Sequence, residues 1–211
     1  MHHRLIRFTL LTVLSSSVGL VALAQTNTDP LKPYTTCKVS GDLKIREVAR
    51  RTSKELFREV TLGTDKQRVS VTDGYRVMFA YRDLLYYFAN VKIEQSSADS
   101  YDKDKEILIS QLKYYTTVKE ATKMIFSDKV QLNGFEHYGL DRDKIDLGGQ
   151  VGAHVLFLDS KHLVVTVYFL NQSKAVFGNN RRFESIQEYH ELKDNFLNAY
   201  SACLKKVADA Q

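Results

Sequence analysis

The alternation of hydrophobic and polar positions predicts strands in the first half of the chain. Residues 68–72 alternate just before Asp73-Gly74, and the alternation resumes over residues 75–81. An Asp-Gly pair between two alternating runs is a strong signal for a tight hairpin turn, because such turns need positive φ angles. The pattern therefore predicts a hairpin with its turn at Asp73-Gly74, and a further strand over residues 86–94. Residues 42–60 suit a strand and a helix equally well.

Strands also dominate the second half of the chain. Short apolar runs on both sides of Asn133-Gly134 predict a second hairpin, which returns over residues 135–140. Residues 151–158 and 163–170 alternate less and read as two longer strands. The second of them is almost continuously apolar, so we expect it at the centre of the sheet.

Two segments have helical rather than strand periodicity. Residues 100–116 and 185–207 each carry apolar side chains three or four positions apart, which is the spacing of one helix face. The order is therefore strands, a helix, about four strands and a closing helix. This order predicts an α+β fold, in which a mostly antiparallel sheet has helices packed on it in an α/β/α sandwich-like arrangement.

The N-terminus has the three parts of a secretory signal peptide. Arg4 and Arg7 precede an uncharged apolar run over residues 8–23, which ends in Ala22-Leu23-Ala24. The alternative is an uncleaved membrane anchor, but a spanning helix needs roughly 20 mostly apolar residues. We therefore expect a signal peptide over residues 1–24 and no transmembrane segment after its removal.

The rest of the chain is expected to form one domain. Residues 25–36 hold both prolines and many polar side chains, which is typical of a flexible leader. The remaining residues 37–211 suffice for a single α+β domain with its own core. Removing Arg4 and Arg7 would lower the formal net charge of +5 by two, and charges of both signs are interspersed. Because nucleic-acid binders concentrate positive charge on one face, we expect no nucleic-acid partner.

Cys37 and Cys203 are the only two cysteines. An exported chain reaches an oxidising compartment, the periplasm or the extracellular medium, where an even cysteine count is typical of disulfide pairing. The sequence therefore predicts a Cys37–Cys203 disulfide, with two separate buried thiols as the alternative.

The predicted order of elements resembles that of the PsbP/Mog1-like family. The resemblance covers roughly residues 68–207: the strand pair around Asp73-Gly74, the first helix, the hairpin at Asn133-Gly134, the long strands to Leu170 and the closing helix. Members of that fold are mostly binding or accessory proteins. The resemblance is one of element order, so it implies no site residue, and fold alone does not assign a function.

Two histidines and two carboxylates are the candidate catalytic residues. His137 and His154 lie on predicted neighbouring strands, and Asp141 and Asp143 follow His137 closely. Convergence of these side chains in one concave site would suit a small hydrolase or a metal-dependent enzyme. The carboxylates around Asp143 do not have the ligand spacing of a calcium loop, and we predict neither a metal nor a cofactor.

A second candidate is an aromatic binding surface at Tyr81, Arg82, Tyr86 and Tyr87, because tyrosine and arginine are enriched at binding hot spots. Ordinary strand aromatics are the alternative. The leading hypothesis is an exported, non-enzymatic binding or accessory protein for an unknown protein or small molecule. The alternatives are the extracytoplasmic enzyme and a structural envelope protein.

Overall fold

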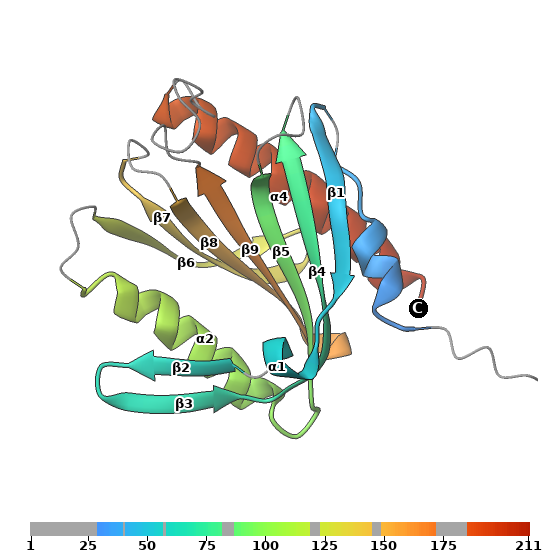
Figure 1. The fold of residues 1–211 in the computed structure, drawn as a ribbon, viewed down its shortest axis with the longest axis vertical. Coiled ribbons are helices and arrows are strands. Elements are labelled where there is room, and N and C mark those ends of the chain that lie inside the picture. Colours follow the sequence, from blue (N-terminus) through green and yellow to red (C-terminus); the bar gives the residue numbers. More distant parts are fainter. Residues whose placement is uncertain are drawn as a thin grey trace, which may run out of the picture.

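A computed structural model provides the fold of this protein (Figure 1). It describes residues 29–39, 41–56, 58–81, 87–118, 123–144, 149–171 and 185–211. The predicted signal peptide lies outside the described residues.

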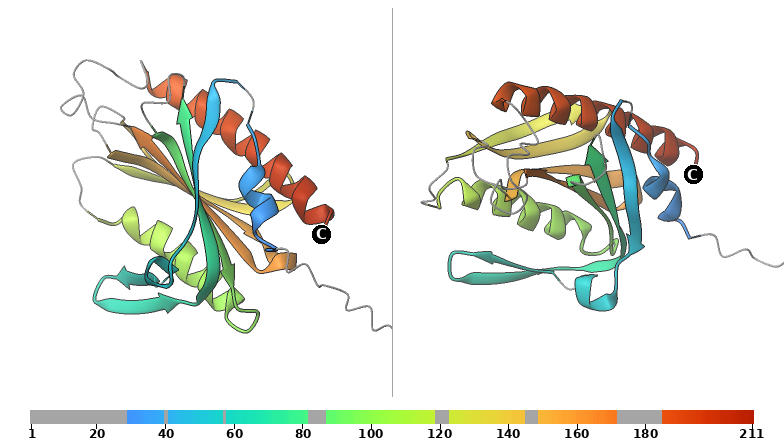
Figure 2. Two further views of the ribbon diagram at one scale, coloured as in Figure 1. Left: turned by 45° about the vertical axis from the view of Figure 1, so that its right-hand side comes forward. Right: turned by 45° about the horizontal axis from the view of Figure 1, so that its top comes forward.

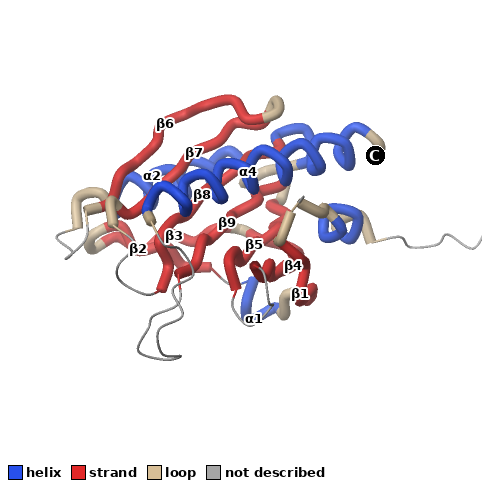
Figure 3. Tube along the Cα trace, turned by 90° about the horizontal axis from the view of Figure 1, so that it is seen from above, coloured by secondary structure: helices blue, strands red, loops and turns tan. Residues whose placement is uncertain are grey.

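The fold is built on a seven-stranded sheet in which every neighbouring pair is antiparallel. β1 and β6 form its two edges, at opposite ends of the sheet in Figure 3. The strands, in spatial order, are β1 (Leu43–Arg50), β4 (Val71–Tyr81), β5 (Tyr87–Ser96), β9 (Leu163–Asn171), β8 (Gly149–Leu158), β7 (Phe135–Arg142) and β6 (Met124–Leu132).

β9 is the central strand, as its apolar run predicted. Val165 and Val167 pack into the core on one face, and Val164 packs into the core on the other. A strand that is covered on both faces needs apolar residues at consecutive positions, which explains its unbroken hydrophobic pattern. A short helical turn, η2 (Asp159–Lys161), connects β8 to β9.

The two long helices cover opposite faces of the sheet (Figure 2). α2 (Tyr101–Tyr115) packs on one face, together with the separate hairpin of β2 (Arg58–Leu62) and β3 (Asp65–Val69). α4 (Ile186–Asp209) packs on the other face. The prediction of a mostly antiparallel sheet with packed helices is confirmed, although the sheet contributes more of the fold than the helices do.

Both long helices lie close to their predicted bounds. Ser185 caps α4, because its side-chain oxygen accepts a hydrogen bond of 3.0 Å from the backbone N–H of Glu188. Tyr189, Phe196 and Tyr200 form its buried stripe. α1 (Ser53–Leu56) is a single turn that follows β1 and contacts β4, so the ambiguous region contains both kinds of structure.

The segment before the sheet belongs to the domain. The short helix η1 (Lys32–Thr36) contacts β4 and α4, and both its residue Tyr34 and the preceding Leu31 are buried. The predicted flexible leader is therefore wrong for this part of residues 25–36, because proline suits the first turn of a helix as well as a linker.

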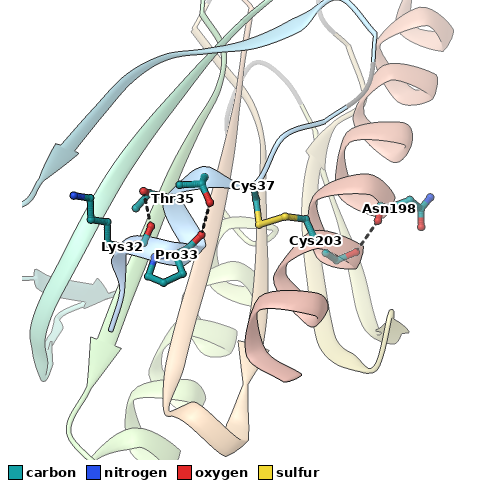
Figure 4. Close-up of a disulfide and its surroundings, with 8 residues drawn as sticks. Lys32, Pro33, Thr35, Cys37, Asn198 and Cys203 are labelled. Carbon is teal, nitrogen blue, oxygen red and sulfur yellow. Dashed lines mark hydrogen bonds between the residues drawn. A yellow bond between two sulfur atoms is a disulfide. The ribbon is translucent and has the colours of Figure 1, made fainter. Parts of the chain in front are cut away.

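The disulfide between Cys37 and Cys203 is confirmed. It joins the end of the η1 segment to α4, with the two Cα atoms 5.6 Å apart (Figure 4). The bridge spans 166 positions and fixes the N-terminal segment on the α4 face.

The predicted turn at Asp73-Gly74 is wrong. Both residues lie inside β4, where the pairing with β5 is irregular. A Cβ on Gly74 would lie 2.8 Å from the carbonyl oxygen of Ile93, so glycine is needed here for close approach rather than for a turn. The β2–β3 turn contains Gly63, whose φ is 64°, and the predicted turn at Asn133-Gly134 is confirmed.

Candidate functional site

The sheet brings three of the four candidate catalytic residues together. His137 and Asp141 lie four positions apart on β7 and share its α4 face, and His154 lies on the neighbouring strand β8. Nε2 of His137 is 3.0 Å from Nδ1 of His154. Nε2 of His154 is in turn 3.1 Å from Oδ1 of Asp141. The three side chains form one continuous hydrogen-bonded chain.

Helix α4 completes this network with two residues. The Tyr189 hydroxyl donates a hydrogen bond of 2.8 Å to Oδ1 of Asp141. The Lys193 ammonium donates one of 2.8 Å to Oδ2 of the same carboxylate. Asp141 therefore accepts hydrogen bonds from β8 and from α4, and the network connects two layers of the fold.

Two glycines make room for the network. A Cβ on Gly139 would lie 2.8 Å from the His154 ring, and a Cβ on Gly152 would lie 2.5 Å from both Oδ1 of Asp141 and the Tyr189 hydroxyl. Neither glycine has a positive φ. Space for the polar side chains, and not backbone conformation, requires glycine at both positions.

The hydrogen-bond pattern fixes one proton of the network. Asp141 can only accept when ionised, so His154 carries a proton on Nε2. Nε2 of His137 and Nδ1 of His154 share a hydrogen bond, and Nδ1 of His137 is buried without a hydrogen-bond partner among the described residues.

The pKa shifts agree with this arrangement. Burial alone would raise the pKa of Asp141, but the hydrogen bond and charge of His154 and the charge of Lys193 outweigh it, so the pKa lies well below its usual range. Burial, followed by the proximity of His154 and Lys193, lowers the pKa of His137 to about 4. His137 is therefore neutral at pH 7.

The network is buried in the protein interior and does not lie in an open, concave site. His137, His154, Asp141, Tyr189 and Lys193 are all buried. Asp143, the fourth candidate, is not part of this network, and its backbone N–H donates a hydrogen bond to the Lys123 carbonyl. Among the residues that the structure describes, no group of three or more metal-ligating side chains could hold an ion.

A cavity of about 300 Å³ lies on the opposite face of the sheet, beneath α2. Its apolar walls come from both layers, and its polar lining includes one arginine and two glutamines. Tyr115 and Gln150 are exposed lining residues, so the cavity has a rim at the surface. The lining residues are Leu108, Gln111, Leu112, Tyr115, Met124, Leu140, Arg142, Gln150, Ala153, Val155, Thr166 and Tyr168.

Two polar groups of the cavity lining have no hydrogen-bond partner among the described residues. Thr166, on the central strand, is 1% exposed, and its Oγ1 atom is buried and unpaired. Nε of Arg142 is also buried and unpaired. Buried polar groups are almost always hydrogen-bonded, so each of these atoms needs a partner that the described residues do not supply.

The patterns in the sequence do not predict this cavity. A polar residue inside the apolar run over residues 163–170 was the one available signal, and Thr166 is that residue. The small side chain of Ala153 and the position of α2 above it form the cavity, and neither follows from periodicity.

The predicted aromatic surface is only partly described. Tyr81 is half-buried with its ring centroid 6.4 Å from that of Phe88, and Tyr87 lies under the guanidinium of Arg46. Arg82 and Tyr86 lie outside the described residues. Neither Tyr81 nor Tyr87 lines the cavity.

No protein-family model, curated protein or solved structure matches this chain. The resemblance to the PsbP/Mog1-like family therefore stays a prediction. In the described part of the chain, no helix combines the length and apolar character that crossing a bilayer requires.

Proposed function

We propose that this chain is an exported, non-enzymatic binding protein that holds a small organic molecule in the cavity beneath α2. The carrying observation is the pair of buried, unpaired polar groups, Thr166 Oγ1 and Arg142 Nε, in a cavity that is lined by both apolar and polar side chains. Apolar walls with a few convergent polar groups are typical of ligand sites, and about 300 Å³ is enough for a small ligand.

Export is supported by two independent features. The N-terminal sequence has a basic head, an uncharged apolar run and the Ala22-Leu23-Ala24 motif. The Cys37–Cys203 bridge is compatible with an oxidising compartment, which is where disulfides persist. The helices on both faces of the sheet also fit the sandwich-like accessory proteins that the resemblance implies.

The histidine network supports a structural role rather than catalysis. A catalytic base must come within hydrogen-bond reach of a substrate proton, yet His137 and His154 are covered by α4-face packing. The unpaired Nδ1 of His137 is the observation that favours the alternative, a small hydrolase. That alternative requires α4 to move away from the sheet, which would break the Asp141–Lys193 contact.

A thermal-shift screen of the oxidised protein tests the proposed function. We expect an organic compound from a panel of lipids, carboxylates, sugars, nucleotides and peptides to raise the melting temperature. At a hundredfold excess over Kd the stabilisation is about 2.7 kcal/mol. The same compound should not stabilise Ala153→Phe, which fills the cavity, but should stabilise Ser110→Phe, which adds the same ring on the exposed side of α2. Equal shifts in both variants, or no shift from any compound, would refute the proposal.

A further inference from the structure

We infer that the ligand of the cavity is an amphipathic carboxylate, whose anionic group pairs with Arg142 and whose apolar body lies along Leu140, Ala153 and Val155. The inference rests on the proposed function, because it names the chemical class that the same cavity binds.

Arg142 is the only charged residue among the described residues that line the cavity. It is half-buried, and in the described part of the chain no carboxylate forms an ion pair with it. The neighbouring Asp141 points to the opposite face, where Lys193 and His154 occupy it. A partly buried guanidinium without a counter-charge is unfavourable, and an anionic ligand would provide that counter-charge.

The chemistry of arginine favours a carboxylate. A guanidinium presents several N–H donors in a fixed plane, which matches the two oxygens of a carboxylate. Gln150 and Gln111, which also line the cavity, supply further amide N–H groups. Gln150 is exposed, so this polar end lies towards the rim.

The opposite end of the cavity is deeper, and its lining is apolar except for the Thr166 hydroxyl. Arg142 lies two positions beyond Leu140 on β7, and Leu140 pairs with Ala153 on β8. Two positions further along β8, Val155 pairs with Thr166 of β9. All four of these inner residues are buried. A ligand that enters with its apolar body first would therefore bury that body and leave its charge at Arg142.

Uncharged side chains of α2 line the side of the cavity that faces the sheet. Leu108 and Leu112 are buried on the helix face towards the sheet, and Met124 of β6 is half-buried beside them. No described lining residue carries a negative charge. The cavity therefore combines one positive charge near its rim with apolar side chains from both the sheet and α2, besides a few uncharged polar groups, and this combination is complementary to an alkyl or aryl carboxylate.

Isothermal titration calorimetry with octanoate and 1-octanol tests the inference, because the two probes share an alkyl chain and differ in charge. We expect the wild-type protein to bind octanoate at least tenfold more tightly than 1-octanol. Arg142→Gln should lose this preference and keep its affinity for 1-octanol, whereas Arg142→Lys should retain part of the preference. Circular dichroism confirms that each variant is folded.

The outcomes separate this inference from the proposed function. If the wild-type protein binds both probes equally, or if Arg142→Gln keeps the preference, the carboxylate inference is overturned while the binding function stands. If neither probe binds but another compound stabilises the protein in an Ala153-dependent manner, the ligand class is wrong and the cavity still binds. If no compound binds at all, the proposed function itself fails.

Discussion

Lys193 on helix α4 donates a hydrogen bond of 2.8 Å to the carboxylate of Asp141 on strand β7. Both side chains are buried, so neither charge is solvated by bulk water. Each charge depends on the other, and the pair therefore links the closing helix to the half of the sheet that also forms the cavity floor.

Removing the charge of Asp141 should destabilise the fold strongly. Asp141→Asn leaves the buried Lys193 ammonium with only the exposed Asp194 carboxylate as a counter-charge, and breaking a buried pair in this way costs about 3–5 kcal/mol of unfolding free energy. Urea denaturation measures the change. The matched control is Asp194→Asn, because Asp194 also contacts Lys193, at 3.4 Å, but its side chain is 63% exposed. We expect a change of less than about 1 kcal/mol there, and equal losses in the two variants would contradict the account.

Stability should fall between pH 6.5 and pH 4 because of His137. Its pKa is about 4 in the folded protein and near the ordinary value of 6.5 in the unfolded chain. In this window the unfolded state binds the extra proton, so acidification favours unfolding by up to about 3 kcal/mol in total. Above pH 6.5 the imidazole is neutral in both states, so His137 no longer lowers the free energy of unfolding.

Asp141 also contributes to the pH dependence, but in a lower range. Because its pKa is lowered in the folded protein, it reduces the free energy of unfolding only as the pH falls to the ordinary pKa of an aspartate, near 3.8, and below. A variant of His137 separates the two contributions. His137→Gln should flatten the dependence of unfolding free energy on pH between 6.5 and 4. His190→Gln, at a half-buried position of α4 outside the network, is the control and should change this slope less than His137→Gln does. An unchanged slope in His137→Gln would contradict the assigned neutral state.

Gly152→Ala should destabilise the protein by about 1–3 kcal/mol, since an added Cβ would lie 2.5 Å from Asp141 Oδ1 and the Tyr189 hydroxyl. The penalty should be smaller when Gly152→Ala is introduced into Tyr189→Phe, because that background lacks the hydroxyl. A double-mutant cycle of urea denaturation midpoints measures this coupling. Strict additivity of the two changes would show that the methyl group does not meet the Tyr189 hydroxyl.

Loss of the disulfide should lower stability on the order of 5 kcal/mol, because the bridge closes a loop of 166 positions in the unfolded chain. The Cys37→Ser/Cys203→Ser variant and the reduced wild-type protein should unfold at similar, lowered denaturant concentrations. Coincident unfolding curves for oxidised and reduced wild-type protein would contradict this expectation.

Local periodicity predicted the helices and most strands, because a buried helical stripe and a covered strand each leave a direct pattern in the sequence. The turn predicted at Asp73-Gly74 was wrong, because a glycine can be required for close packing as well as for a positive φ angle. The sequence also proposed His137, His154 and Asp141 as partners, since β7 and β8 are neighbours along the chain. The contributions of Tyr189 and Lys193 depend on how α4 crosses the sheet, which no local pattern encodes.

Sequence patterns predict the cavity even less well than they predict the contacts of α4. Thr166 looks like a single polar interruption in an apolar strand, and Arg142 lies in a charged run at the end of another strand. Only the register of three strands places the two residues around one space. Its depth depends on the small side chain of Ala153 beneath α2, which is a property of packing and not of periodicity.

Methyl-detected NMR of the oxidised protein with octanoate and with 1-octanol tests whether a ligand binds beneath α2. A bound probe should shift the methyl signals of Leu108, Leu112, Met124, Leu140 and Val155, and leave those of Leu197 and Leu204 on the α4 face unchanged. Shifts confined to the α4 face, or no shift at saturating concentrations of either probe, would contradict a ligand site beneath α2.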